Sequence, residues 1–187
     1  MNTNLNAEML STVSDYKLDI PKFLKQLKGE SLSLDIFQFS KLASYLEKEG
    51  RYLPEGFKKE FIKESLNHFF TCWMGFRNLN LQNDLQNVFD VLNDDNMPGL
   101  PDDLISFFDS TTGVCDDPVL KKMLLITVIY SIIKKIPIHP LTIPFPAGKK
   151  IYERNGSYYC PVKENHKDDL FALCRFCIAR PEDGFKL

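Results

Sequence analysis

The chain has 187 residues, of which 44% are apolar and 12% aromatic, enough to fill one ordinary hydrophobic core. Its 23 lysines and arginines nearly balance 25 aspartates and glutamates, so the whole-chain charge predicts no nucleic-acid partner. The N-terminus lacks a signal-peptide pattern, and the most apolar run, 123–133, is shorter than the roughly 20 residues that a membrane-spanning helix needs. We therefore expect a cytoplasmic protein with no membrane partner.

The start of the chain predicts a polar arm followed by two helices. Residues 1–15 have few apolar positions, and we expect a loosely held arm there. Pro21 suits the first turn of a short helix that Gly29 ends, because the fixed φ and missing N–H of proline cost little in a first turn. A second helix is expected from Ser33, whose hydroxyl can cap it, to Gly50.

A long helix is expected from Pro54 to about Arg77, where apolar residues recur at helical spacing. His68 and Cys72 are four residues apart on it, which places them on one face. Such a pair can bind a metal ion. The aromatic residues around Cys72 favour instead a buried core cysteine, because free cysteine is among the most buried residue types.

The region 78–118 contains nine aspartates and no lysine or arginine. Its apolar spacing predicts a helix near 81–92 and a short helix over 104–108. A calcium loop starting at Asp94 is excluded, because Ile105 would stand where that loop needs a bidentate glutamate. Several of the acids precede helix starts, where carboxylates cap N–H groups. We favour this capping interpretation, and the alternative is an acidic docking face for an unidentified protein partner.

The centre of the expected fold is the segment 119–136, which is apolar nearly all the way round and must therefore be packed on all sides. The fold class is mainly α: a helical bundle around this central helix, with a C-terminal β-hairpin and a short helix that form a cysteine knuckle. We divide the single domain, 1–187, into a helical body over 16–136, a proline-rich extended strap over 137–149 and the hairpin–helix knuckle over 150–180.

The knuckle begins with a β-hairpin. Asn155 and Gly156 lie between two β-forming segments, and this pair is a strong hairpin signal because both turn positions need positive φ. A last short helix is expected to start at Asp168 and Asp169 and to end at Pro181.

Three of the five cysteines lie in this C-terminal segment together with His166. Cys174 and Cys177 are three residues apart, so on a helix both sulfurs leave one face, and Cys160 at the end of a strand can approach them. Three cysteines and a histidine are typical of a closed, structural zinc site. We therefore expect a binding or scaffold module in which zinc is held by Cys160, Cys174, Cys177 and His166.

Two other interpretations stay open. The same cysteines could serve a metal-dependent or redox enzyme, as in an iron–sulfur cluster with Cys72 or Cys115 as fourth ligand. They could also be plain core residues of a helical protein without metal. His139 on the strap is a further candidate fourth ligand. The chain contains no common phosphate-binding or hydrolase motif, so enzyme activity remains undecided.

The C-terminal motifs resemble those of an uncharacterised protein family of methanogenic archaea, a domain of unknown function. The resemblance is carried by YYCPVK at 158–163 and LCRFC at 173–177, with His139-Pro140, Pro-Phe-Pro at 144–146 and Tyr52-Leu53-Pro54 as weaker matches. It implies an archaeal cytoplasmic protein, the three cysteines as part of the family pattern, and no assigned activity.

Overall fold

The computed structural model describes residues 20–83, 117–143, 145, 148–166 and 172–182. In this part of the chain the structure is mainly helical with one small sheet. The elements, with η for a 3₁₀ turn, are α2 (Ile20–Ser33), η1 (Ile36–Gln38), α3 (Phe39–Glu49), η2 (Gly50–Tyr52), α4 (Glu55–Arg77), α7 (Pro118–Lys134), β1 (Tyr152–Arg154), β2 (Ser157–Cys160), η4 (Lys163–His166), η5 (Leu173–Phe176) and β3 (Arg180–Pro181).

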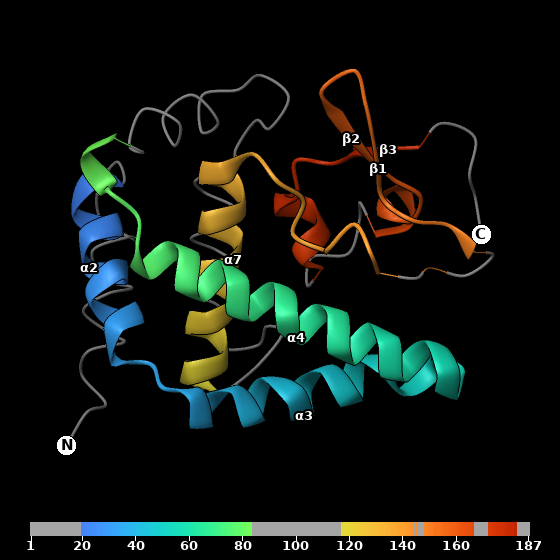
Figure 1. Ribbon diagram of the computed structural model, residues 1–187, viewed down its shortest axis with the longest axis horizontal. Helices are drawn as coiled ribbons and strands as arrows, with labels where there is room; N and C mark the ends of the chain where they lie inside the picture. Colours follow the sequence, from blue (N-terminus) through green and yellow to red (C-terminus); the bar gives the residue numbers. More distant parts are fainter. Residues whose placement is uncertain (1–19, 84–116, 144, 146–147, 167–171, 183–187) are drawn as a thin grey trace.

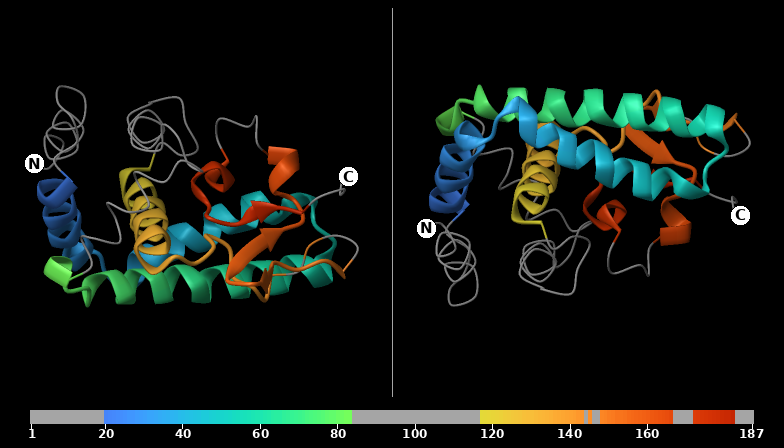
Figure 2. Two further views of the ribbon diagram at one scale, coloured as in Figure 1. Left: turned by 90° about the horizontal axis from the view of Figure 1, so that it is seen from above. Right: turned by 90° about the horizontal axis from the view of Figure 1, so that it is seen from below.

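Helix α4 runs along the length of the molecule and organises the other elements (Figure 1). Helices α2 and α7 cross it in one half, and the C-terminal sheet lies in the other half (Figures 1 and 2). The expected bounds from Pro54 to about Arg77 agree with the observed helix. The expected helix over 104–108 and most of the helix near 81–92 lie outside the described residues, as does most of the acidic region 78–118.

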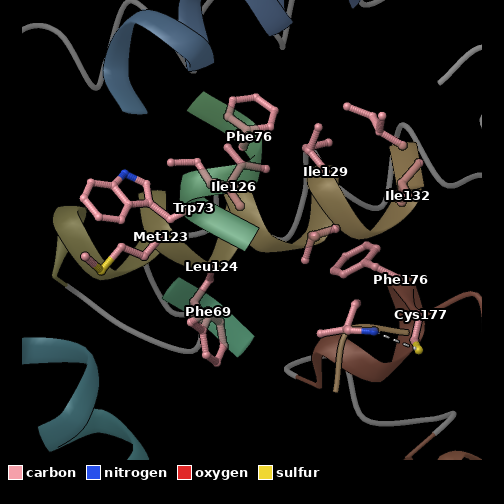
Figure 3. Packing of buried hydrophobic residues seen from close by; sticks show 14 of the residues in the cluster. Phe69, Trp73, Phe76, Met123, Leu124, Ile126, Ile129, Ile132, Phe176 and Cys177 are labelled. Atoms are coloured by element: carbon pink, nitrogen blue, oxygen red, sulfur yellow. Dashed lines mark hydrogen bonds between the residues drawn. The ribbon is translucent and has the colours of Figure 1, made fainter. Parts of the chain in front are cut away.

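Helix α7 is packed on nearly all sides, as its apolar sequence predicted. Eleven of its 17 residues are buried. Phe69, Trp73 and Phe76 of α4 pack against it (Figure 3). Asp117 caps its N-terminus by accepting from the backbone N–H groups of Val119 and Leu120. None of the described helices is both long and apolar enough to cross a bilayer.

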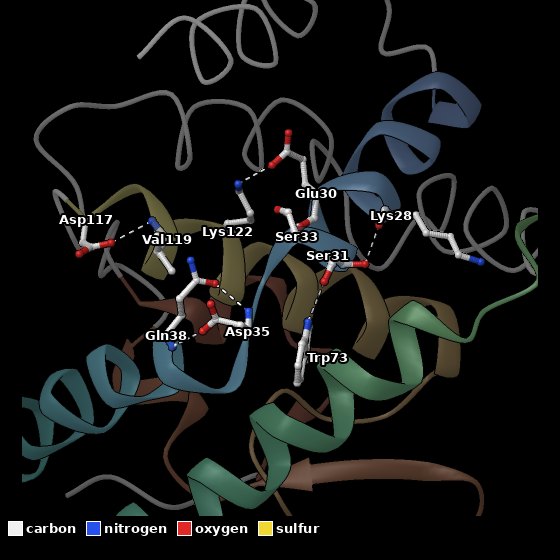
Figure 4. Close-up of polar contacts among 10 residues, drawn as sticks. All are labelled: Lys28, Glu30, Ser31, Ser33, Asp35, Gln38, Trp73, Asp117, Val119 and Lys122. Atoms are coloured by element: carbon white, nitrogen blue, oxygen red, sulfur yellow. Dashed lines mark hydrogen bonds and ion pairs between the residues drawn. The ribbon is translucent and has the colours of Figure 1, made fainter. Parts of the chain in front are cut away.

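The turn between α2 and α3 differs from the sequence prediction. Gly29 does not end the first helix, which continues to Ser33. Asp35, rather than Ser33, caps the next turn through a capping box with Gln38 (Figure 4). Ser33 instead donates its hydroxyl to the carbonyl of Glu30. The prediction failed here because serine, like aspartate, can bond to several nearby backbone groups.

Two buried contacts fix α2 against the other helices. The indole N–H of Trp73 donates to the carbonyl of Ser31 at 3.0 Å (Figure 4). Helix α4 thus supplies a donor for a backbone carbonyl in the last turn of α2. Lys122 of α7 pairs with Glu30, and both side chains are largely shielded from water. These polar groups stay satisfied where the three helices meet, as buried polar groups must.

The C-terminal sheet contains the expected hairpin and one strand that was missed. Asn155 and Gly156 both have positive φ, and β1 pairs antiparallel with β2. Strand β3 adds to β2 in parallel. The last helix expected from Asp168 to Pro181 is wrong in its described part, where the chain makes only the turn η5 before an extended run into β3. Pairing with β2 satisfies backbone groups that a helix would have satisfied internally.

Candidate functional site

The three C-terminal cysteines are brought into one region by different elements. Cys160 ends β2, Cys174 lies in η5, and Cys177 follows that turn immediately. All three are free thiols and are at most 9% exposed. Cys177 follows η5 in an extended conformation, and its N–H donates to the Cys174 carbonyl at 3.1 Å, which closes the turn between the two cysteines.

Backbone N–H groups point at two of these sulfurs. The N–H of Ile138, on the strap, donates to Cys177 Sγ at 3.5 Å. The N–H groups of Val162 and Lys163 donate to the sulfur of Cys160. Such N–H donors stabilise the thiolate form of a cysteine more than the thiol form.

Two of these thiols, Cys160 and Cys174, are nevertheless poor nucleophiles as they stand. Burial raises the pKa of Cys174 to about 12, with the nearby charges of Cys177 and Cys160 acting in the same direction. Burial also raises the pKa of Cys160, against the two N–H donors and the ammonium group of Lys163. A buried thiol with a raised pKa is mostly protonated at neutral pH. This arrangement disfavours a reactive metal-free dithiol.

The structure places His166 at the exposed end of η4. It lies within electrostatic reach of His139, which the strap carries directly after Ile138. Among the described residues, no group of three or more histidine, cysteine, aspartate or glutamate side chains is arranged to hold a metal ion. The three cysteines therefore share a region without forming a finished ligand shell.

Cys72 on α4 lies in the core, as its aromatic surroundings predicted, and His68 beside it is half-buried. Cys72 is fully buried, and its Sγ is 3.6 Å from His68 Nε2. Burial raises the pKa of Cys72 to about 12, opposed by the hydroxyl of Ser131. The His68 ring also bonds to the backbone of Ile138. The pair thus connects α4 with the strap, while Cys115 lies outside the described residues.

Sequence reasoning missed the donors from Ile138 and Val162, because any residue other than proline carries a backbone N–H and its sequence gives no signal. It also missed which residues share the outer face of the sheet. That information was available in principle, since alternate strand residues point to opposite faces, but the pairing of β3 was not expected.

The fold and the thiol cluster together define a mainly helical protein with a small C-terminal sheet and three buried cysteines in and beside it. The chain belongs to the family described as "Uncharacterized protein conserved in archaea (DUF2115)", whose model matches residues 20–182. The resemblance to an uncharacterised archaeal family is therefore confirmed, and with it an unassigned function.

Curated relatives from methanogens agree with this assignment. A "UPF0305 protein" of Methanococcus maripaludis strain C5 is 34% identical over 159 residues, which cover 85% of this chain and 94% of the relative. A "UPF0305 protein" of Methanothermobacter thermautotrophicus is 32% identical over 162 residues, covering 84% and 93%. One from Methanocaldococcus jannaschii is 23% identical over 171 residues, covering 88% and 98%. No solved structure matches the chain significantly.

Proposed function

We propose that this protein is a binding or scaffold module whose C-terminal unit is held together by one structural zinc ion. Cys160, Cys174 and Cys177 supply three thiolates and His166 the fourth ligand. The observation that carries the proposal is the gathering of three buried thiols from β2 and η5, with backbone N–H groups directed at two of the sulfurs. Thiolate and imidazole ligands suit zinc.

The charges near the cluster support a thiolate site. Three thiolates and a neutral imidazole around Zn²⁺ leave one net negative charge. Lys163 offsets it, since its ammonium group stabilises the charged forms of Cys160 and Cys174 and donates to the carbonyl of Cys177. Binding requires the thiols to lose their protons, so zinc must replace the protons that burial favours.

The proposal requires the four ligands to close on the ion when it binds. Zinc–sulfur bonds of about 2.3 Å at tetrahedral angles put sulfurs about 3.8 Å apart. This spacing requires the side chains of the cysteines at η5 and at the end of β2 to rotate, and His166 to turn toward the cluster from its exposed position. Metal sites in small domains commonly complete their geometry only when the ion binds.

Metal content tests the proposal directly. Protein purified without chelator or a histidine tag should contain about one zinc per chain by mass spectrometric metal analysis. Cys174→Ser should lose most of it, because the site keeps too few thiolates. Cys72→Ser is the matched control, since it removes a buried thiol of the helical body and should retain the metal.

The fourth ligand is tested separately by His166→Ala, which should lower the zinc affinity measured in competition with a chromophoric chelator. Unchanged affinity would remove His166 from the site. Protein that neither contains zinc nor takes it up, or that keeps it after Cys174→Ser, would contradict the proposal. A brown protein with visible absorbance would show an iron–sulfur cluster instead of zinc.

A further inference from the structure

The pairing of the sheet sorts its side chains onto two faces. Residues directly opposite each other on neighbouring strands point to the same side. Tyr152 pairs with Tyr159, and Tyr159 pairs with Arg180, so one row crosses all three strands. Arg154 and Ser157, which are also paired, belong to the same face. We call these five residues the outer face.

The opposite face of the sheet points to the core. Cys160 is 3% exposed and Tyr158 packs against the hydrophobic cluster. By contrast, Tyr152 is 36% exposed, and Arg154 and Arg180 are exposed. The sheet lies at one end of the molecule, on the side away from α2 (Figures 1 and 2). The outer face therefore presents tyrosine and arginine side chains to solvent without a described element packed over them.

The two tyrosines already form a stack. The rings of Tyr152 and Tyr159 lie 5.4 Å apart between centroids with an interplanar angle of 16°. The guanidinium of Arg154 lies 5.0 Å from the centroid of the Tyr159 ring. Cross-strand aromatic pairs stabilise a sheet, but they do not need to be exposed to do so. A further flat group can extend this stack on Tyr152.

The charge of the outer face has one sign. Its described residues include two arginines and no acid. The sequence from 148 to 182 has seven lysines and arginines and five acids, a small local excess of positive charge. The whole-chain net charge of −2 hides this local excess. A partner for this face should be anionic and should carry flat rings.

We propose that the outer face binds single-stranded RNA, with a base stacked on Tyr152 and the backbone phosphates held by Arg180 and Arg154. Exposed aromatic side chains on a sheet, flanked by cations, suit unpaired bases because every base has a flat face and every nucleotide a phosphate. Duplexes do not fit, since their bases are already stacked. The hydroxyl of Ser157, on the same face, can bond to a ribose 2′-hydroxyl, which DNA lacks.

This inference does not depend on zinc, because the face is set by backbone pairing between β1, β2 and β3. The whole-chain charge predicted no nucleic-acid partner. The present proposal departs from that prediction for single-stranded RNA only.

Fluorescence anisotropy with labelled oligouridylate and oligoadenylate of about 12 nucleotides tests the proposal. At about 50 mM salt the protein should bind, and affinity should fall steeply as salt rises. Tyr152→Ala should weaken binding by about fivefold or more, whereas Tyr152→Phe should bind like the wild type because the ring is kept. Arg180→Ala should reduce the salt slope by about one.

Lys25→Ala is the matched control, since Lys25 is an exposed cation of α2 outside the outer face, and this variant should bind like the wild type. Circular dichroism should be the same for all variants, because the changed side chains are exposed. No binding, equal loss in Lys25→Ala, or no effect of Tyr152→Ala would overturn the proposal. Equal affinity for single-stranded DNA of the same sequence would overturn the choice of RNA, and dimerisation lost in Tyr152→Ala would show an interface between copies instead.

Discussion

The backbone of Ile138 joins three parts of the chain at one residue. Its N–H donates to Cys177 of the C-terminal unit, and its backbone also bonds to the His68 ring on α4. A short distance along the strap, Thr142 donates to Glu64 of α4 at 2.6 Å. The strap is thus fastened to α4 and to the cysteine cluster by specific polar contacts. Between them it does not stay extended as expected, since it turns at Pro140, where the Ile143 N–H donates to the Pro140 carbonyl at 3.1 Å.

His139, next to Ile138, makes stability depend on pH. Burial, together with the charges of His68 and His166, lowers its pKa from 6.5 to about 4. The unfolded chain therefore binds a proton between pH 6.5 and about 4 that the folded chain does not. The contribution of His139 to the free energy of unfolding is therefore fully present above pH 6.5. It is lost as the pH falls from 6.5 to 4, and the loss amounts to up to about 3 kcal/mol.

Urea unfolding of the wild type and His139→Gln from pH 7 to pH 4 measures this effect. Both proteins should be treated with chelator first, so that metal loss does not contribute. The wild type should lose more stability than the variant, because glutamine does not titrate. Parallel curves would show that His139 does not carry the pH dependence.

At the scale of elements, the side chain of Tyr130 on α7 lies directly against Gly75 of α4. A Cβ at this position would lie 2.3 Å from the hydroxyl oxygen of Tyr130 and 2.4 Å from its Cζ. Gly75→Ala should therefore destabilise the protein by about 1–3 kcal/mol through overpacking, although alanine favours a helix by about 1 kcal/mol. Thermal or urea unfolding measures the change.

Gly56→Ala on the same helix is the matched control. Among described residues no atom lies within 4 Å of the Cβ it would add, so this change should be neutral or stabilising by up to about 1 kcal/mol. Shortening Tyr130 to Leu should remove most of the cost of Gly75→Ala in the double variant. Equal effects at the two glycines would show that the helices do not meet as closely as described.

Strong local patterns predicted the elements of this fold well. The long stripe of α4, the fully apolar α7 and the Asn-Gly turn each point to one structure, and all three agree with it. The turn between α2 and α3 was less predictable, because the side chains of Ser33 and Asp35 can both cap the N-terminus of the next helical turn. Strand β3 is two residues long and pairs with a strand twenty residues away, which no local pattern specifies.

The candidate site could be predicted only as a set of residues. The sequence predicted that Cys160, Cys174 and Cys177 lie close together, and the structure brings them into one region. The prediction rested partly on a wrong reason, because a 3₁₀ turn replaces the helix that was expected there. Whether a metal ion completes the set depends on side-chain rotations and a ligand, which sequence spacing does not determine, so zinc stays a proposal.

At the scale of the whole molecule, the helical body and the C-terminal unit depend on different interactions. The body has a continuous apolar core around α7, whereas the sheet is small and its strands are short. A sheet of this size is only marginally stable by itself and must be stabilised by packing against other elements or by a crosslink. Phe176 lies against α7 near Ile132 (Figure 3), and zinc at the three cysteines would add the crosslink between β2 and η5.

The most direct test of this account is amide hydrogen exchange before and after zinc is removed with a chelator, followed by peptide along the chain. We predict that exchange speeds up in residues 148–166 and 172–182, where the metal joins the sheet to η5, and stays unchanged in α4 and α7. Exchange that is the same in both states, in protein shown to have held zinc, would contradict a structural role for the metal at these cysteines.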